Sequence, residues 1–312
     1  MSEYEFKELK EEFFPDLLPL FKAAYGHTPS LDELKNKYRT KLWLEENLGV
    51  VCYCDNEAVA FVGAVPCILK KGSESLKAAQ IGDVMTHPGH LRYGLFHKTG
   101  KKLFDRLEML GVDVIFGFPN LNSKPGFKKR LGWIFTDELK VSIIDVKCLP
   151  FIRLTSLLPF LRKPISRFQR NYFERKSIDP VPFISCLGED FFEVRKDVDY
   201  LKYKLKHKES FILKLKGKVV WVKFEKMYLY VGNIESCDFA TFTSIIDELK
   251  RICLITGIPH IRFNVSDGSL MKSFVDKITN EDTKSFAVGG LIFKEGISFN
   301  QLKFSMSDND TF

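Results

Sequence analysis

The chain opens with a helical pattern of apolar and polar positions. Residues 15–26 have the spacing of a short helix. The segment 30–43 begins with Ser30 three residues before Glu33, which is the spacing of a helix capping box. We therefore expect the chain to start with helices.

A change to β-rich patterning follows. Two runs within residues 49–72 flank a polar break at residues 55–57, and a third run covers residues 76–87. Helical spacing returns in the apolar face formed by Leu95, Thr99, Leu103, Leu107 and Leu110. A short apolar strand at 112–118 and a helix ending near Gly132 come next. The order predicted up to residue 133 is thus α-α-β-β-β-α-β-α.

The second half of the chain repeats this order loosely. A helix near 199–208 precedes a meander over 210–234, a helix over 239–256, a strand at 260–266, a helix at 269–278 and one or two final strands within 285–294. The halves share no obvious sequence identity, so the pattern suggests a structural duplication. We expect domains at 1–146 and 181–312, joined by a connector at 147–180.

The connector differs in composition from its surroundings. Residues 147–176 contain Pro150, Pro159, Pro164, eight Lys or Arg, and one acid, Glu174. This mixture of basic and apolar residues is compatible with peripheral contact of residues 149–173 with an anionic membrane. Because the prolines interrupt any long helix, a linker packed across both domains is the favoured interpretation.

Composition places the protein among ordinary globular proteins. The chain has 312 residues, is 45% hydrophobic, and contains no long uncharged apolar run. Its N-terminus is acidic and its seven cysteines are scattered without a CxxC pair, so we expect a cytoplasmic protein with reduced thiols. The net charge of +7 favours an anionic ligand without requiring nucleic acid.

The junction at residues 82–107 is the strongest candidate site. A β-rich run ends at a Pro-Gly break, and a turn containing Arg92 and Gly94 leads into a helix. The first amides of a helix have no intrahelical partner and hold phosphate oxygens well, and glycine lets the backbone approach them. Arg92 and Lys98 would add charge.

The stretches 81–107 and 112–133 resemble the acyl-CoA-binding core of the GNAT acetyltransferase superfamily. In that superfamily a strand leads into a glycine-containing turn, a long helix, a strand, an asparagine-containing turn and a helix that closes with Gly-aromatic. The resemblance is strongest over residues 30–140 and recurs more weakly over 190–295, as in tandem GNAT proteins. It implies an α/β (α+β) fold: a mixed, mostly antiparallel sheet flanked by helices, with a second GNAT-like domain.

The resemblance also implies positions for a bound acetyl-CoA or other acyl-CoA. The pyrophosphate would lie at the turn, the pantetheine arm along the strand end, and the second strand–helix junction beside them. The residues implied are Val84, Met85, Thr86, Leu91, Arg92, Tyr93, Gly94, Leu95, Phe96, Asn120, Asn122 and Ser123.

Three positions depart from the family pattern. Leu91 stands where Gln or Arg is usual, and Phe96 stands where a small residue is usual, so that its ring would crowd the phosphates unless it turned into the core. Phe127 replaces the tyrosine that protonates the departing thiolate in many relatives. Tyr93, Ser123 or water would have to supply that proton.

Asp83 and His87 are the candidate bases, because they lie nearest in sequence to the implied thioester. Each also has a structural interpretation, Asp83 in orienting the turn and His87 in packing. A metal site at His87, His90 and His97 is disfavoured because no Asp, Glu or Cys accompanies them at zinc-site spacing.

The second half should not bind CoA. Its helix begins near Asp238 without a glycine-rich turn, and a carboxylate at that position would repel phosphate.

The sequence thus predicts an acyl-CoA-dependent N-acetyltransferase that acts on a small-molecule amine, an amino sugar being one candidate, with no metal. The alternatives are an aminoacyl or long-chain acyl transferase and a catalytically degenerate CoA-binding module. The acceptor and the oligomeric state are open.

Overall fold

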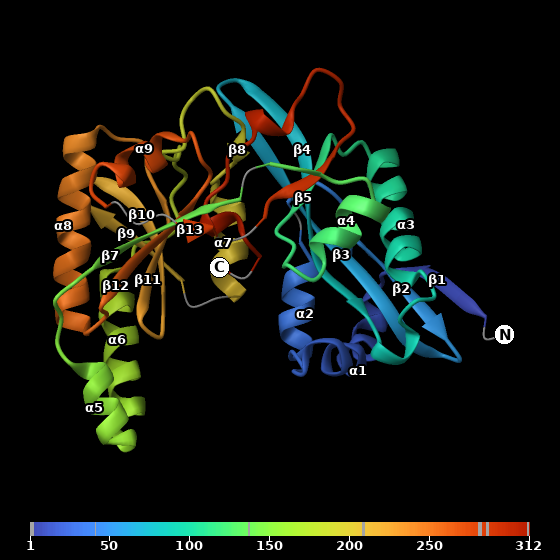
Figure 1. Cartoon of the computed structure of the whole chain (residues 1–312), viewed down its shortest axis with the longest axis horizontal. Helices are drawn as coiled ribbons and strands as arrows, with labels where there is room; N and C mark the ends of the chain where they lie inside the picture. Colours follow the sequence, from blue (N-terminus) through green and yellow to red (C-terminus); the bar gives the residue numbers. More distant parts are fainter. Residues whose placement is uncertain are drawn as a thin grey trace. The chain divides into compact units, whose positions relative to one another are not determined.

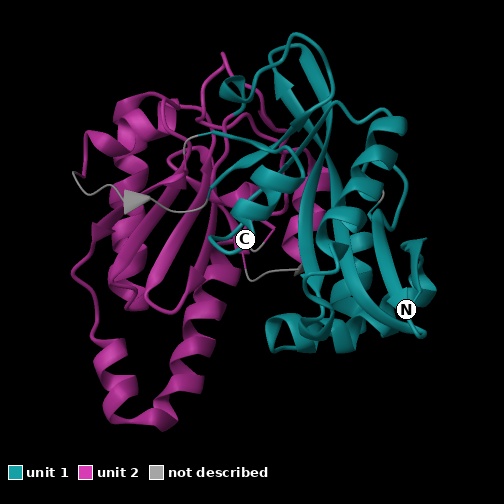
Figure 2. Ribbon diagram, turned by 45° about the vertical axis from the view of Figure 1, so that its right-hand side comes forward, with its two compact units in different colours: residues 1–136, 286–302 teal, residues 137–285, 303–312 magenta. Residues whose placement is uncertain are grey.

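The computed structural model describes residues 3–40, 42–136, 138–207, 210–279, 283–284, 287–310 and 312. The chain forms two compact units (Figure 2). Unit 1 comprises residues 1–136 and 286–302, and unit 2 comprises residues 137–285 and 303–312.

Unit 1 is built around one sheet whose strands follow the order β1-β2-β3-β4-β5-β14-β6. Pairing is antiparallel except between β4 and β5, which run parallel and are joined by α3. Its elements (Figure 1) are β1 (Tyr4–Glu8), α1 (Phe14–Tyr25), α2 (Leu31–Tyr38), β2 (Gly49–Cys54), β3 (Glu57–Lys71), β4 (Glu74–Thr86), α3 (Leu95–Met109), β5 (Val114–Gly117), α4 (Lys124–Arg130), β6 (Ile134–Phe135) and β14 (Gly289–Ile292).

Helices cover both faces of this sheet because its strands are apolar on both sides. Val51 and Tyr53 of β2 pack with α1 and α2, whereas their neighbour Val50 packs with α3 and α4. Four of the five residues on the predicted apolar face of α3 are buried, namely Leu95, Thr99, Leu103 and Leu107. The site strand β4 is therefore held between two layers of helices.

Unit 2 repeats the same plan. Its sheet has the order β13-β7-β12-β11-β10-β9, with one parallel pair, β11 and β12, joined by α8. Its elements are β7 (Lys140–Asp145), α5 (Phe151–Leu157), α6 (Arg162–Lys176), β8 (Glu193–Val194), α7 (Val198–His207), β9 (Ser210–Leu215), β10 (Lys218–Glu225), β11 (Tyr228–Ile234), α8 (Phe239–Thr256), β12 (His260–Val265), α9 (Leu270–Asp276) and β13 (Thr283–Lys284).

The two mostly antiparallel sheets flanked by helices confirm the predicted fold class. The meander, helix and parallel strand β2-β3-β4-α3-β5 correspond in order and direction to β9-β10-β11-α8-β12. The predicted capping box is also present, because Ser30 N donates to Glu33 Oε2 at 2.6 Å and Glu33 N donates to Ser30 Oγ at 3.2 Å.

The boundary between the units differs from the expected contiguous division. β7, inside the segment 1–146, pairs with β12 in unit 2, and β14, inside the segment 181–312, pairs with β5 in unit 1. Hydrogen bonds between strands that are distant in sequence determine which sheet a short strand joins. The local pattern of apolar and polar residues does not predict that pairing.

One expectation about local structure was wrong. The first described element is strand β1, because residues 4–8 pair with β2 and form the edge of the sheet despite their charge. The connector belongs to unit 2 and contains the 15-residue helix α6. Its prolines lie where elements begin: Pro150 caps α5, and Pro164 falls in the first turn of α6, where its missing N–H costs no hydrogen bond.

Candidate active site

The end of β4 has an open edge. Its parallel pairing with β5 runs from Ala78 to Gln80, whereas β4 itself continues to Thr86 and remains paired with β3 on its other side. Among the described residues, no strand pairs with Ile81–Thr86 along the β5 side. Apart from the Val84 carbonyl, which accepts from the Tyr25 hydroxyl at 3.0 Å, backbone groups on that edge could pair with an extended, amide-containing ligand.

The turn that follows β4 has an unusual backbone. Arg92 has a φ of 74° and Gly94 has a φ of 74°, so two left-handed residues flank Tyr93 immediately before α3. Turns with such alternating conformations direct successive amides toward one point and bind anions. A Cβ added at Gly94 would meet no atom within 4 Å, so the space beside these amides is open.

The N-terminus of α3 lacks a cap from its own side chains. Gly94 is the N-cap, no side chain accepts a hydrogen bond there, and the first turn contains no acid. The amides and the positive end of the helix dipole are thus left for an external anion. This is the arrangement expected of a pyrophosphate site.

Phe96 resolves one departure from the family pattern. Its ring packs edge-on against Phe127 at 5.1 Å and lies beside Gly126, so that it points into the layer between α3 and α4. Phe127 itself is buried, with its ring centroid 4.0 Å from that of Trp133. Phe127 is therefore a core residue.

Asp83 lies at the irregularity where the β3–β4 register shifts, and its φ is 47°. Its carboxylate accepts a hydrogen bond from Tyr38 Oη at 2.6 Å and pairs with Lys37 Nζ at 2.8 Å. The ring of Tyr38 lies against Gly63, where any Cβ would overlap it. This network ties the end of α2 to the irregular part of β4.

Tyr25 reaches the same strand from α1. Its hydroxyl donates to the carbonyl of Val84 at 3.0 Å, and its side chain is 44% exposed. Val84 and Thr86 are half-buried, whereas Met85 is buried between β4 and α1. The open end of β4 thus has a polar aromatic side chain beside it.

His87 is engaged with the backbone of its own turn. Its Nδ1 accepts a hydrogen bond from Gly89 N at 3.1 Å, which places its ring proton on Nε2 when the imidazole is neutral. Its ring lies edge-on to His90 at 5.7 Å, and His90 Nδ1 is 3.1 Å from Tyr4 Oη. The lone pair that a general base needs is occupied at Nδ1 in this structure.

Asn120 organises the second junction. Its Oδ1 accepts hydrogen bonds from Asn122 N at 3.0 Å and from Ser123 N at 2.9 Å, and Ser123 Oγ lies 3.2 Å from the same atom. Asn120 thereby closes the turn that begins α4. The other predicted turn residues divide by exposure: Leu91 and Tyr93 are more than half exposed, and Leu95 is buried.

The corresponding site of unit 2 is filled by the protein itself. Asp238 is the N-cap of α8, and its carboxylate accepts from Thr241 N at 2.7 Å, a hydrogen bond that lowers its pKa. Beyond the last parallel pair, Val231 and Phe263, a Cβ at Gly232 would overlap the ring of Phe312. In unit 2, the N-terminus of α8 is therefore capped by Asp238, and the space beside Gly232 of β11 is filled by Phe312.

Sequence reasoning missed Tyr25, Lys37 and Tyr38. Tyr25 lies in α1, and Lys37 and Tyr38 lie in α2. Tyr25 is 59 residues from Val84, and Tyr38 is 45 residues from Asp83. No local signal marks them, because their roles depend on helix packing across the sheet.

Two general features bear on other chemistries. In the described ranges, no group of three or more His, Cys, Asp or Glu side chains is placed to hold a metal. Over the same residues, no helix combines the length and apolar character needed to span a bilayer.

Comparisons with known proteins agree with this geometry. Residues 5–136 match the family model of the acetyltransferase (GNAT) domain. A search of curated proteins finds no significant match.

Solved structures share the fold over nearly the whole chain. A conserved protein of unknown function from Enterococcus faecalis V583, a probable N-acyltransferase, aligns with a TM-score of 0.63 and 13% identity, covering 94% of this chain and 73% of that one. A GCN5-related N-acetyltransferase from Kribbella flavida gives 0.59 and 13%, covering 93% and 70%. One from Anabaena variabilis gives 0.58 and 9%, covering 94% and 73%.

The family match covers the open end of β4, the amide-lined turn and α3, which are the parts from which the site is built. Residues 5–136 are therefore similar to the acetyltransferase (GNAT) domain, and the chain as a whole shares the fold of solved GCN5-related N-acetyltransferases.

Proposed function

We propose that this protein transfers an acetyl group from acetyl-CoA directly to a primary amine of a small molecule. The observation that carries the proposal is the uncapped N-terminus of α3 beside the open edge of β4. An acyl-CoA has a pyrophosphate for the first feature and an amide-containing arm for the second. When bound, it would supply the activated thioester.

The chain's own residues would act mainly by positioning. Amides of residues 92–96 would hold the phosphates, and the free edge of β4 would align the arm. Asp83, restrained by Lys37 and Tyr38, would maintain the irregular backbone that orients this edge. For an amine attacking a thioester, alignment and a hydrogen-bond donor at the carbonyl oxygen are the principal requirements.

The burial of Phe127 favours one alternative, a CoA-binding module without catalysis. Incubation of the protein with acetyl-CoA and a panel of amino sugars, polyamines and peptides, with released thiol as the readout, separates the two. Thiol release that requires an amine supports the transferase. Tight CoA binding with no thiol release in the presence of any acceptor supports the CoA-binding module without catalysis. Parallel incubations with aminoacyl-tRNA and acyl carrier protein test other donors.

We expect acyl transfer without an acyl-enzyme. Burial raises the pKa of the Cys52 thiol to about 11 and that of Cys186 to about 12, so neither is a thiolate at neutral pH. The mass of the protein should remain unchanged after mixing with acetyl-CoA alone. A stoichiometric acetylated species that disappears when amine is added would contradict direct transfer.

We also expect one CoA per chain. Asp238 and Phe312 occupy in unit 2 the positions that are open in unit 1. Titration calorimetry should therefore give a stoichiometry near one, and Gly94→Ala should weaken that single event. A value near two would show that the second unit also binds the donor.

We place this activity in the cytoplasm, in line with the seven cysteines, all of them in the described part of the chain, none of which forms a disulfide.

A further inference from the structure

A helical hairpin of unit 2 lies outside the acyl-donor site. It consists of α5, a short turn at Pro159–Leu161, and α6. Its base is anchored: Phe173 is fully buried and stacks on Phe211 at 5.3 Å and on Phe224 at 5.1 Å. The base of the hairpin is thus fixed to the sheet of unit 2.

The tip of the hairpin is apolar and exposed. Leu157 is 76% exposed and Phe160 is 71% exposed, on either side of Pro159. Further large apolar side chains that are more than a third exposed continue along the α5 arm, namely Leu149, Ile152, Leu154 and Leu158. Contiguous exposed apolar residues of this kind mark interaction surfaces.

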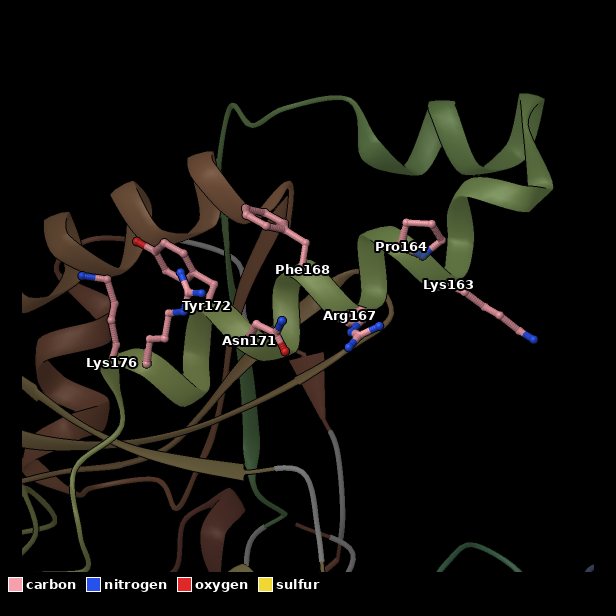
Figure 3. A pocket seen from close by; sticks show the side chains of 8 residues that line it. Lys163, Pro164, Arg167, Phe168, Asn171, Tyr172 and Lys176 are labelled. Carbon is pink, nitrogen blue, oxygen red and sulfur yellow. The ribbon is translucent and has the colours of Figure 1, made fainter.

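Basic side chains accompany the tip. An open groove of about 770 Å³ runs along α6, and its lining includes the basic residues Lys163, Arg167, Arg175 and Lys176. Figure 3 shows Lys163 extending from the helix into open space near the turn. Glu174, the one acid between residues 147 and 176, is paired with Arg170 at 2.9 Å. The surface therefore carries a net positive charge.

We propose that this hairpin docks the protein on an anionic lipid bilayer, with Leu157 and Phe160 in the boundary between headgroups and acyl chains. Arg153, Arg162, Lys163 and Arg167 would then meet the headgroup phosphates. A bilayer satisfies both features, since it offers an apolar layer directly beneath a layer of negative charge. A nucleic acid would match the charges but would leave the apolar tip in water.

The test is sedimentation of the full chain with vesicles. Binding should be strong to equal parts of phosphatidylcholine and phosphatidylglycerol and weak to phosphatidylcholine alone. It should fall on going from about 0.1 M to about 1 M salt, where the Debye length shrinks from about 10 Å to about 3 Å.

Two double variants separate the contributions. Lys163→Gln with Arg167→Gln should weaken binding about thirtyfold, since each basic residue near an anionic surface contributes about fivefold. Leu157→Ser with Phe160→Ser should weaken it about tenfold or more through lost apolar insertion. All four side chains lie on the surface of unit 2, so unfolding midpoints should be unchanged.

Matched controls lie in unit 1. Met109→Ser with Leu121→Ser removes equally exposed apolar side chains, and Lys128→Gln with Lys129→Gln removes an equal charge; neither should alter vesicle binding. The proposal would be overturned if the control variants lost as much vesicle binding as the hairpin variants. It would also be overturned if the protein bound a duplex RNA but not anionic vesicles. CoA affinity, measured on every variant, reports on the acyltransferase proposal independently.

Discussion

Replacing Gly94 with alanine should weaken CoA binding at least about tenfold, or by about 1.4 kcal/mol. The added Cβ would enter the open space beside the amides of the turn, where the pyrophosphate is proposed to lie. Each hydrogen bond to a charged group contributes about 1.5 to 3 kcal/mol, so displacing the phosphate by even a short distance is costly. Titration calorimetry with CoA measures the effect.

Gly111 provides the matched control, because it lies at the other end of α3. Its φ is 78°, against 74° at Gly94, and a Cβ there also meets no atom within 4 Å. Gly94→Ala and Gly111→Ala should therefore lose similar stability, about 1 kcal/mol, from forcing alanine into the left-handed region. Equal CoA affinity in the two folded variants would refute the assignment of the pyrophosphate to this turn.

Asp308→Asn should cost unit 2 about 3 to 5 kcal/mol of folding free energy. Asp308 Oδ1 lies 2.5 Å from Lys196 Nζ, and neither side chain has any solvent exposure. Lys196 also donates to the Val194 carbonyl at 2.8 Å and interacts electrostatically with Glu193, but without Asp308 the buried ammonium loses the carboxylate that contacts it directly. Chemical denaturation of the full chain, followed by far-ultraviolet circular dichroism, measures the loss.

Exposed and doubly substituted variants test this explanation. Glu174→Gln removes one member of the exposed i,i+4 pair with Arg170 and should change stability by no more than about 0.5 kcal/mol. Lys196→Met combined with Asp308→Leu removes both charges and should recover part of the loss. The recovery should be incomplete because the buried Ser305 amide, which donates to Asp308 Oδ2 at 2.8 Å, loses its acceptor. An unchanged unfolding midpoint for Asp308→Asn alone would rule out the expected penalty.

Local patterns in the sequence determined most of the secondary structure and part of the site. The periodic face of α3, the capping box of α2, the meanders and the cap at Asp238 depend on residues within a few positions of each other, where chain geometry leaves few options. The position of Gly94 in a turn before a helix could be predicted for the same reason, because the strand, the turn and the start of the helix lie within one short stretch.

Only the tertiary structure decided which distant groups complete each feature. β14 joins β5 from another part of the chain, Lys37 and Tyr38 hold Asp83, Phe96 turns onto Phe127, and Phe312 fills the opening beside Gly232. These partners are chosen by packing and hydrogen bonding between segments whose separation along the chain carries no periodic signal. The strand, the turn and the helix start of the candidate donor site were therefore predictable from the sequence, whereas the side chains that restrain them were not.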